Sequence, residues 1–262
     1  MAIGVGVVVE DVTKQFRGDS GSLLVLDRVS LYCRSGEFVS VLGPSGAGKT
    51  TLLRLIAGLD HPETGRVVYV DDSSDRVDRS RVRIGMVFQE PRLLPWASVF
   101  ANVSYGLQDA ANKITRSERK RMTSDMIERL GLGAFSSYLP HQISGGMAQR
   151  VALGRALVGD PDLLLLDEPL GSLDIKNRLA IQDLLVEIAG SGSPHPCACI
   201  MVTHSIDEAI YLSDRIYVLS ERPASVLAEI DVPITRPRDR VYSDFSEVRR
   251  QVIEALGVSP SE

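Results

Sequence analysis

Cysteine is scarce in this 262-residue sequence, which contains three, too few for a disulfide framework. The count favours a reducing compartment. His195 lies close to Cys197 and Cys199, but the run CACIMVT is typical of a buried strand. We therefore expect the two thiols to pack on one face of a strand instead of binding a metal ion. No apolar run is long enough to cross a bilayer, so a role at a membrane would need another subunit to span it.

Basic residues do not outnumber acidic residues in the sequence. The sequence has 29 Lys and Arg against 34 Asp and Glu, a formal net charge of -5, which implies no global attraction to nucleic acid or anionic lipid. The start, MAIGVGVVVEDV, lacks the basic segment and cleavage site of a signal peptide, and we expect a strand there. The length can hold one large domain, or a core with an added lobe.

Alternating strand and helix patterns predict an α/β fold. VGVVVEDVTKQF, SLLVLDRVSLYC and GEFVSVLG predict strands, and DLLLLDEP predicts a strand buried in a parallel sheet. A charged helix is predicted between them, with a capping box of Thr115 and Glu118, and Ser205 and Glu208 predict a second box further on. We expect a parallel α/β core interrupted by a mostly helical insert, followed by a hairpin with ERPAS at its turn and an amphipathic helix.

GPSGAGKT, residues 43–50, matches the pattern G-x-x-x-x-G-K-[ST] between an apolar strand and a helix, as a phosphate-binding loop requires. Its glycines let the loop wrap with successive amides toward phosphate oxygens. Lys49 would place its charge on the β- and γ-phosphates and Thr50 would offer a hydroxyl to Mg²⁺, while the next helix adds its dipole. The nucleotide contacts predicted in this loop are Gly43, Pro44, Ser45, Gly46, Ala47, Gly48, Lys49, Thr50 and Thr51.

The run LLLLDEP supplies carboxylates suited to a nucleotide-bound cation. We expect Asp167 near Mg²⁺, through water, with Glu168 next to it. Two acids at the end of a buried strand are costly unless a cation lies nearby. Pro169 predicts an extended backbone at Glu168, because the residue before a proline is restricted.

A second glycine-rich stretch, QISGGMAQR at residues 142–150, also precedes a helical pattern. Bare backbone that opens a helix is an anion-binding arrangement, although the first loop already provides a phosphate site.

Together these motifs resemble those of the ATP-binding cassette (ABC) ATPases over nearly the whole chain. Besides the two nucleotide motifs, the resemblance rests on the signature stretch Ser144-Gly145-Gly146, on Gln89 and His204 after apolar strands, and on GSLD ending in Asp174. Two positions depart from the family pattern: Met147 replaces a common glutamine and Ser172 a common alanine.

The resemblance implies an α/β fold with a P-loop NTPase (RecA-like) core, an N-terminal antiparallel β subdomain and an inserted α-helical subdomain. We expect one ABC ATPase domain over residues 1–262. Its predicted parts are an α/β core at 1–89 and 156–220, a helical lobe at 90–155, and a C-terminal hairpin strand and helix at 221–262.

The resemblance also implies a division of chemical roles. Glu168 would polarise the attacking water, His204 would steady that water and the γ-phosphate, and Gln89 would reach Mg²⁺. The signature stretch would cap the ATP held by a second copy of the chain, with Asp174 at the interface of this homodimer. Phe16, in VTKQF, fits the aromatic that stacks on adenine.

LLPW, which follows Gln89 in the stretch FQEPRLLPW, resembles the importer cassettes for nitrate, aliphatic sulfonates and taurine. This likeness implies an ATPase at the cytoplasmic face of the inner membrane, partnered by polytopic permease subunits, indirectly by a solute-binding protein, and not by nucleic acid. Leu93, Leu94 and Trp96 either receive a short helix of the membrane subunit or pack within the lobe. A soluble ABC ATPase of an assembly complex and an exporter or lipid-transport cassette are the alternatives.

Overall fold

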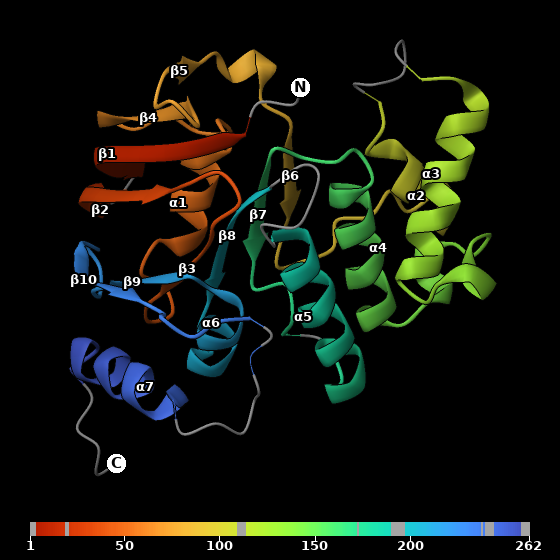
Figure 1. The fold of residues 1–262 in the computed structure, drawn as a ribbon. Helices are drawn as coiled ribbons and strands as arrows, with labels where there is room; N and C mark the ends of the chain where they lie inside the picture. Colours follow the sequence, from red (N-terminus) through yellow and green to blue (C-terminus); the bar gives the residue numbers. More distant parts are fainter. Residues whose placement is uncertain are drawn as a thin grey trace.

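Two sheets of different kinds build the fold in the computed structural model, which describes residues 4–18, 21–108, 114–171, 173–189, 197–236, 238 and 244–257. The first sheet is antiparallel with strand order β2-β1-β4-β5, and the second has the order β10-β9-β3-β8-β7-β6 (Figure 1). In the second sheet, β3, β6, β7, β8 and β9 run parallel and β10 pairs antiparallel with β9. The strands are β1 (Val5–Gly18), β2 (Gly21–Cys33), β3 (Phe38–Leu42), β4 (Thr64–Asp71), β5 (Arg76–Val77), β6 (Ile84–Val87), β7 (Leu163–Asp167), β8 (Ala198–Thr203), β9 (Arg215–Leu219) and β10 (Val226–Asp231).

Seven α-helices occur in the described part of the chain. Helix α1 lies between the two sheets, and α2, α3 and α4 gather on one side of the molecule, away from the antiparallel sheet (Figure 1). The helices are α1 (Lys49–Ile56), α2 (Val99–Tyr105), α3 (Arg116–Arg129), α4 (Gly145–Leu157), α5 (Ile175–Ala189), α6 (Ile206–Leu212) and α7 (Asp244–Ala255), with short 3₁₀ segments at Arg79–Arg81, Gly133–Phe135 and Pro140–Gln142.

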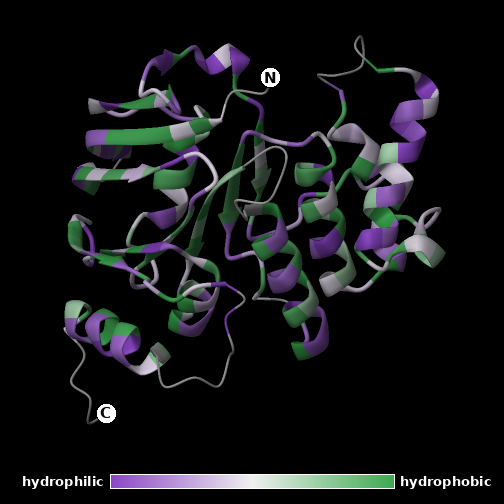
Figure 2. Ribbon diagram, in the orientation of Figure 1, coloured by the Kyte–Doolittle hydropathy of each residue, from purple (hydrophilic) through white to green (hydrophobic). Residues whose placement is uncertain are grey.

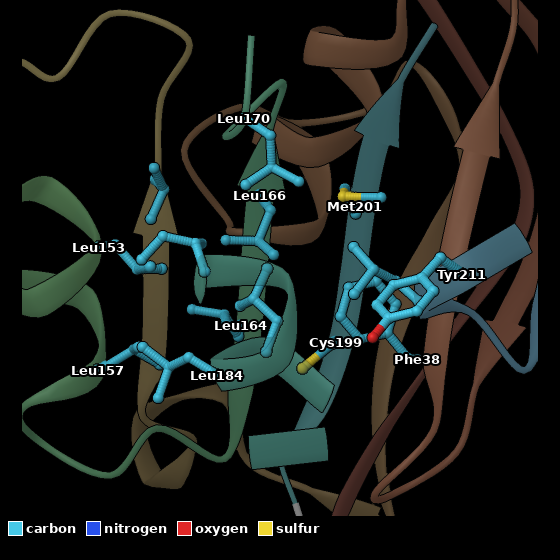
Figure 3. Packing of buried hydrophobic residues seen from close by; sticks show 14 of the residues in the cluster. Phe38, Leu153, Leu157, Leu164, Leu166, Leu170, Leu184, Cys199, Met201 and Tyr211 are labelled. Atoms are coloured by element: carbon cyan, nitrogen blue, oxygen red, sulfur yellow. The ribbon is translucent and has the colours of Figure 1, made fainter. Parts of the chain in front are cut away.

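Period-two alternation divides the core between the two faces of the parallel sheet. Leu164 and Leu166 of β7 pack with Leu153 and Leu157 of α4 on one face, and Figure 3 shows these side chains together with those of α5, α6, β3 and β8. The other face packs on α1 and the antiparallel sheet. Figure 2 shows that the central strands of the parallel sheet are hydrophobic, whereas α3 is largely hydrophilic. The parallel sheet is therefore covered on both faces, as its continuous apolar strands predict.

Helix caps confirm one local prediction and correct another. Thr115 and Glu118 form the predicted capping box at the start of α3. The Ser205 hydroxyl accepts from the Glu208 amide at 3.3 Å, but the Glu208 carboxylate accepts from the Thr203 hydroxyl at 3.1 Å and not from the Ser205 amide. The prediction of a second capping box was wrong because the Thr203 hydroxyl binds both groups that would close it. It donates to the Glu208 carboxylate and accepts from the Ser205 amide.

The hairpin of β9 and β10 and the thiols follow the sequence predictions. ERPAS lies in the turn between the two antiparallel strands. Cys197 and Cys199 are buried in the same core cluster, as expected of packing residues. His195 and Ser172 lie outside the described residues, and among the described ones no group of three or more His, Cys, Asp or Glu side chains is placed to hold a metal.

None of the described helices combines the length and the apolar character of a membrane span.

Candidate active site

The predicted site residues at the carboxyl ends of β3, β6, β7 and β8 gather at one edge of the parallel sheet. In the register of the sheet, Leu42 of β3 pairs with Thr203 of β8, and Asp167 of β7 pairs with Val202 of β8. Strands β6 and β7 end beside each other in the same way. The carboxyl edge of an open α/β sheet is where ligands bind. Segments that start near residues 43, 89, 167 and 204 therefore meet in space.

A cavity of about 450 Å³ opens at this edge. It collects most of the predicted nucleotide contacts and leaves out the glycine-rich stretch near residue 144. Its lining consists of Phe16, Leu23, Val25, Ser45, Gly46, Gly48, Lys49, Thr50, Thr51, Gln89, Asp167, Glu168 and Arg222. The predicted residues that do not line it are Gly43, Pro44, Ala47, Ser144, Gly145, Gly146, Asp174 and His204.

The loop before α1 needs glycine at two positions for steric reasons. Gly46 has a φ of +78° and Gly48 a φ of +92°, values that L side chains rarely adopt. A Cβ on Gly48 would also lie 2.6 Å from Cγ1 of Val25. The loop thus keeps a backbone-lined wall, with α1 starting directly after Gly48.

Lys49 folds back onto its own loop. Its side chain is 7% exposed, and Nζ donates to the carbonyl oxygens of Gly43 at 2.8 Å and Pro44 at 2.9 Å. Burial lowers the pKa of the ammonium. The hydrogen bonds that Nζ makes in the described part of the chain go to neutral carbonyl oxygens, so a phosphate in the cavity would be a stronger partner.

Asp167 and Thr50 form an oxygen-rich pair in the lining of the same cavity. The Thr50 hydroxyl donates to Oδ1 of Asp167 at 3.1 Å, and Asp167 is 3% exposed. Burial raises the pKa of this carboxyl, the direction expected when an acid is removed from water. A carboxylate, a hydroxyl and the amide oxygen of Gln89 are hard donors of the kind that Mg²⁺ prefers, with its remaining positions filled by water and phosphate. The donor set therefore fits Mg²⁺.

Glu168 has a left-handed backbone, with a φ of +45°. The extended conformation predicted from Pro169 was wrong. The Glu168 amide donates to the carbonyl oxygen of Val202 at 3.0 Å, which keeps the residue in line with the sheet while the chain turns away after it. A left-handed non-glycine residue costs about 1–2 kcal/mol and is typical of functional sites.

This conformation directs the Glu168 carboxylate toward two predicted partners. Its Oε2 lies 3.4 Å from Nε2 of Gln89 and 3.4 Å from Nδ1 of His204. The His204 side chain is 67% exposed. The three residues come from the ends of β7, β6 and β8, and both contacts are long enough for a ligand to rearrange them.

The signature stretch lies away from the cavity. The Ser144 hydroxyl caps α4 by accepting from the amide of Met147 at 3.2 Å, so α4 begins at Gly145. A Cβ on Gly145 would meet nothing within 4 Å. Asp174 also faces away: its Oδ1 accepts from the Asn177 amide at 3.0 Å, and this bond lowers the pKa of the Asp174 carboxyl.

Helix α4 anchors the segment that follows Gln89. Two terminal nitrogens of Arg155 donate to the carbonyl oxygens of Pro91 and Arg92, both at 2.9 Å. Gln149, which is 2% exposed, donates to the carbonyl oxygen of Phe88 at 3.4 Å. The helix that begins with the signature stretch therefore holds the backbone on both sides of Gln89.

Three lining residues escaped the sequence analysis: Leu23, Val25 and Arg222. The first two belong to the antiparallel sheet, and Arg222 lies in the turn between β9 and β10. Because β9 pairs in parallel with β3, it ends beside the phosphate-binding loop that follows β3. Knowing that these two strands are neighbours would have identified the turn after β9 as part of the site. The order of strands across the sheet is not readable from one sequence.

A family model described as ABC transporter matches residues 26–171, more than half of the chain. The chain belongs to the ABC transporter family. An uncharacterized ABC transporter ATP-binding protein of Methanocaldococcus jannaschii is 40% identical over 248 residues, covering 95% of this chain and 90% of that protein. An aliphatic sulfonates import ATP-binding protein of Burkholderia cenocepacia is 41% identical over 236 residues, covering 90% of this chain and 83% of that protein.

Solved structures give the same family. A dimeric bacterial ABC transporter cassette superposes with a TM-score of 0.76 at 30% identity, covering 87% of this chain and 100% of that one. Another structure of that cassette, with the same figures, is in a post-hydrolysis state bound to ADP and Pi. The chain is thus an ATP-hydrolysing ABC cassette that binds ATP and ADP, and the predictions of family, P-loop NTPase fold and enzyme class are confirmed.

Proposed function

We propose that this ABC ATPase is the energy-supplying subunit of an importer for a small sulfonate-like solute. The observation that carries the proposal is the likeness to aliphatic sulfonates import ATP-binding proteins, which are about 40% identical over nine-tenths of the chain. The LLPW stretch after Gln89 points to the same group.

In this proposal the cavity binds one nucleotide. The loop from Gly43 to Thr51 holds the phosphates, and Phe16, 42% exposed at the cavity wall, stacks on adenine. Thr50, Asp167 and Gln89 hold Mg²⁺, which when bound neutralises and orients the phosphate oxygens.

Glu168 acts on the attacking water in the same proposal. Its carboxylate polarises the water toward the γ-phosphate, and His204, in contact with the same carboxylate, steadies both groups. Because the left-handed backbone sets the direction of Glu168, catalysis depends on the sharp turn after β7 as well as on the acid itself.

The signature stretch serves a second copy of the chain. Nothing in the described part of the chain needs glycine at position 145, since a side chain there would meet open space. Close approach of another molecule accounts for it: in a head-to-tail pair, Ser144, Gly145 and Gly146 of each copy would cap the nucleotide held by the other, with Asp174 at the interface. The related solved cassette is dimeric, which supports this arrangement.

Trp96 supports a membrane partner. Its side chain is 76% exposed, whereas Leu93 packs against the core and Leu94 is half-buried. Buried Asn102 fixes this loop through the amide of Leu94 at 2.8 Å and the carbonyl oxygen of Ala97 at 2.9 Å. A large apolar group held out on a fixed loop suits a partner helix. We place the cassette at the cytoplasmic face of the inner membrane below permease subunits, with a solute-binding protein selecting the cargo.

Affinity capture from detergent-solubilised membranes tests the partner. We expect the tagged chain to recover a polytopic membrane protein and Trp96→Ala to lose it. Tyr105→Ala, at an exposed aromatic on α2, is the matched control and should retain it. Recovery of a soluble scaffold protein alone would support the assembly-complex alternative.

Growth tests the solute. A strain without this chain should fail to grow on an aliphatic sulfonate as the only sulfur source while growing normally on sulfate. The parent chain should restore growth and Glu168→Gln should not. Normal growth of the deletion strain on sulfonates rules out the sulfonate assignment.

A further inference from the structure

Arg222 reaches the nucleotide cavity from an unexpected direction. It lies in the turn between β9 and β10, lines the cavity, and donates from Nε to the carbonyl oxygen of Gly46 at 2.9 Å. Its guanidinium lies close over the loop, because a Cβ on Gly46 would come within 2.8 Å of Nη2. A cation thus lies against the glycine-rich wall.

The turn that carries Arg222 is held firmly. Ala224 is fully buried, its amide donates to the carbonyl oxygen of Val25 at 2.9 Å, and its carbonyl oxygen accepts from the amide of Asp27 at 2.9 Å. Within the turn, the Ser220 hydroxyl accepts from the Ser225 amide at 3.0 Å. The position of Arg222 is therefore set by β2 and by the turn, and is not that of a freely mobile surface arginine.

Arg222 is available to a ligand because it pairs with none of the described acidic residues that line the cavity. Lys49 and Arg222 are the cations among the lining residues, and Asp167 and Glu168 are the acids. Lys49 is bonded to carbonyl oxygens of its own loop. No carboxylate in the described part of the chain forms an ion pair with Arg222, and its bond to Gly46 uses one of the five N–H donors of a guanidinium.

We propose that Arg222 is a second nucleotide-binding cation, which contacts the phosphates of the nucleotide held by its own chain. The inference rests on the proposed role of the cavity. Apart from Arg222, Lys49 is the one cationic side chain among the described lining residues, and in the proposed site Mg²⁺ balances the charge of Asp167. With Arg222, the hairpin turn contributes a second cation and further N–H donors beside the phosphate-binding loop.

Binding of ADP with Mg²⁺ tests this proposal, because ADP needs no second copy of the chain. Affinity would be measured with a fluorescent ADP analogue for Arg222→Gln, Arg222→Lys and the matched control Arg121→Gln, which removes the same charge from a residue with a 71% exposed side chain on α3. We expect Arg222→Gln to weaken binding about tenfold, as loss of a charge-assisted hydrogen bond does. Arg222→Lys should stay within about threefold of the parent, because the charge is kept.

Each other result overturns the proposal. Unchanged affinity in Arg222→Gln means that the guanidinium does not contact the nucleotide. Equal losses in Arg222→Lys and Arg222→Gln mean that the charge is not the reason. Lys49→Ala separates this inference from the proposed site: if that variant binds ADP normally, the cavity itself is misassigned. Melting temperatures of the ligand-free variants should match the parent, since the Arg222 side chain lies on the surface.

Discussion

Replacing Glu168 with glutamine should separate nucleotide binding from hydrolysis. The change keeps the shape of the side chain and its contacts with Gln89 and His204, both at 3.4 Å, but removes the charge that polarises water. Loss of a general base costs about a hundredfold or more in turnover, or about 2.7 kcal/mol in the activation barrier. Affinity for ATP should stay within about threefold, because Lys49 and the loop are untouched.

The same substitution should not weaken the ligand-free fold. The charge of Glu168 helps to raise the pKa of neighbouring Asp167, so the glutamine relieves a repulsion between two acids at the end of β7. The assays are steady-state phosphate release with saturating MgATP, nucleotide titration and thermal melting. Glu187→Gln, which alters a side chain that is 71% exposed on α5, is the matched control. Near-normal hydrolysis by Glu168→Gln refutes the assigned role.

Three further predictions concern the acidic pair, a helix cap and the segment after Gln89. Burial raises the pKa of Asp167 above its usual 3.8, so the folded state binds the proton more strongly than the unfolded state. The stability of the ligand-free fold therefore falls as pH rises from 3.8 through the raised pKa. Ligand-free Asp167→Asn should melt at a higher temperature than the parent at neutral pH, and this gain should shrink toward about pH 4. Thr115→Ala removes the capping box of α3 and should cost about 1 kcal/mol in denaturant unfolding, with ATPase activity kept. Arg155→Ala frees the carbonyl oxygens of Pro91 and Arg92 and should lower kcat about tenfold while nucleotide affinity stays near that of the parent, because the backbone around Gln89 loosens.

Contradicting outcomes differ among these three variants. A lower melting temperature for Asp167→Asn at neutral pH would show that ionised Asp167 stabilises the ligand-free fold. Unchanged stability in Thr115→Ala would mean that the cap is dispensable. If Arg155→Ala keeps the kcat of the parent, α4 does not position Gln89 for catalysis.

Local features of the site could be predicted from the sequence because their causes are local. The glycine positions of the phosphate-binding loop follow from the loop conformation itself, and LLLLDEP reads as a buried strand that ends in acids. The capping box of α3 depends on residues three apart. In each case the interacting groups lie within one short segment.

Other features depend on neighbours that are distant in the sequence. The conformation of Glu168 follows from its amide bond to Val202 on the adjacent strand, which the local proline rule ignores. The contribution of Arg222 depends on β9 lying beside β3. The boundaries at 89–90, 155–156 and 220–221 and the roles of the individual site residues stay predictions.

Cross-linking between two copies tests the central claim most directly. Ser45 and Ser144 are both exposed, whereas the native thiols Cys33, Cys197 and Cys199 are all buried, so introduced cysteines would react selectively. Ser45→Cys and Ser144→Cys chains, each carrying Glu168→Gln, would be mixed with MgATP and a short thiol cross-linker. We predict a species of twice the chain mass that forms only in the mixture and only with ATP. A chain that carries both cysteines serves as a second test. If the mixture stays monomeric, or if the chain with both cysteines cross-links only within one copy, the two copies do not share a nucleotide.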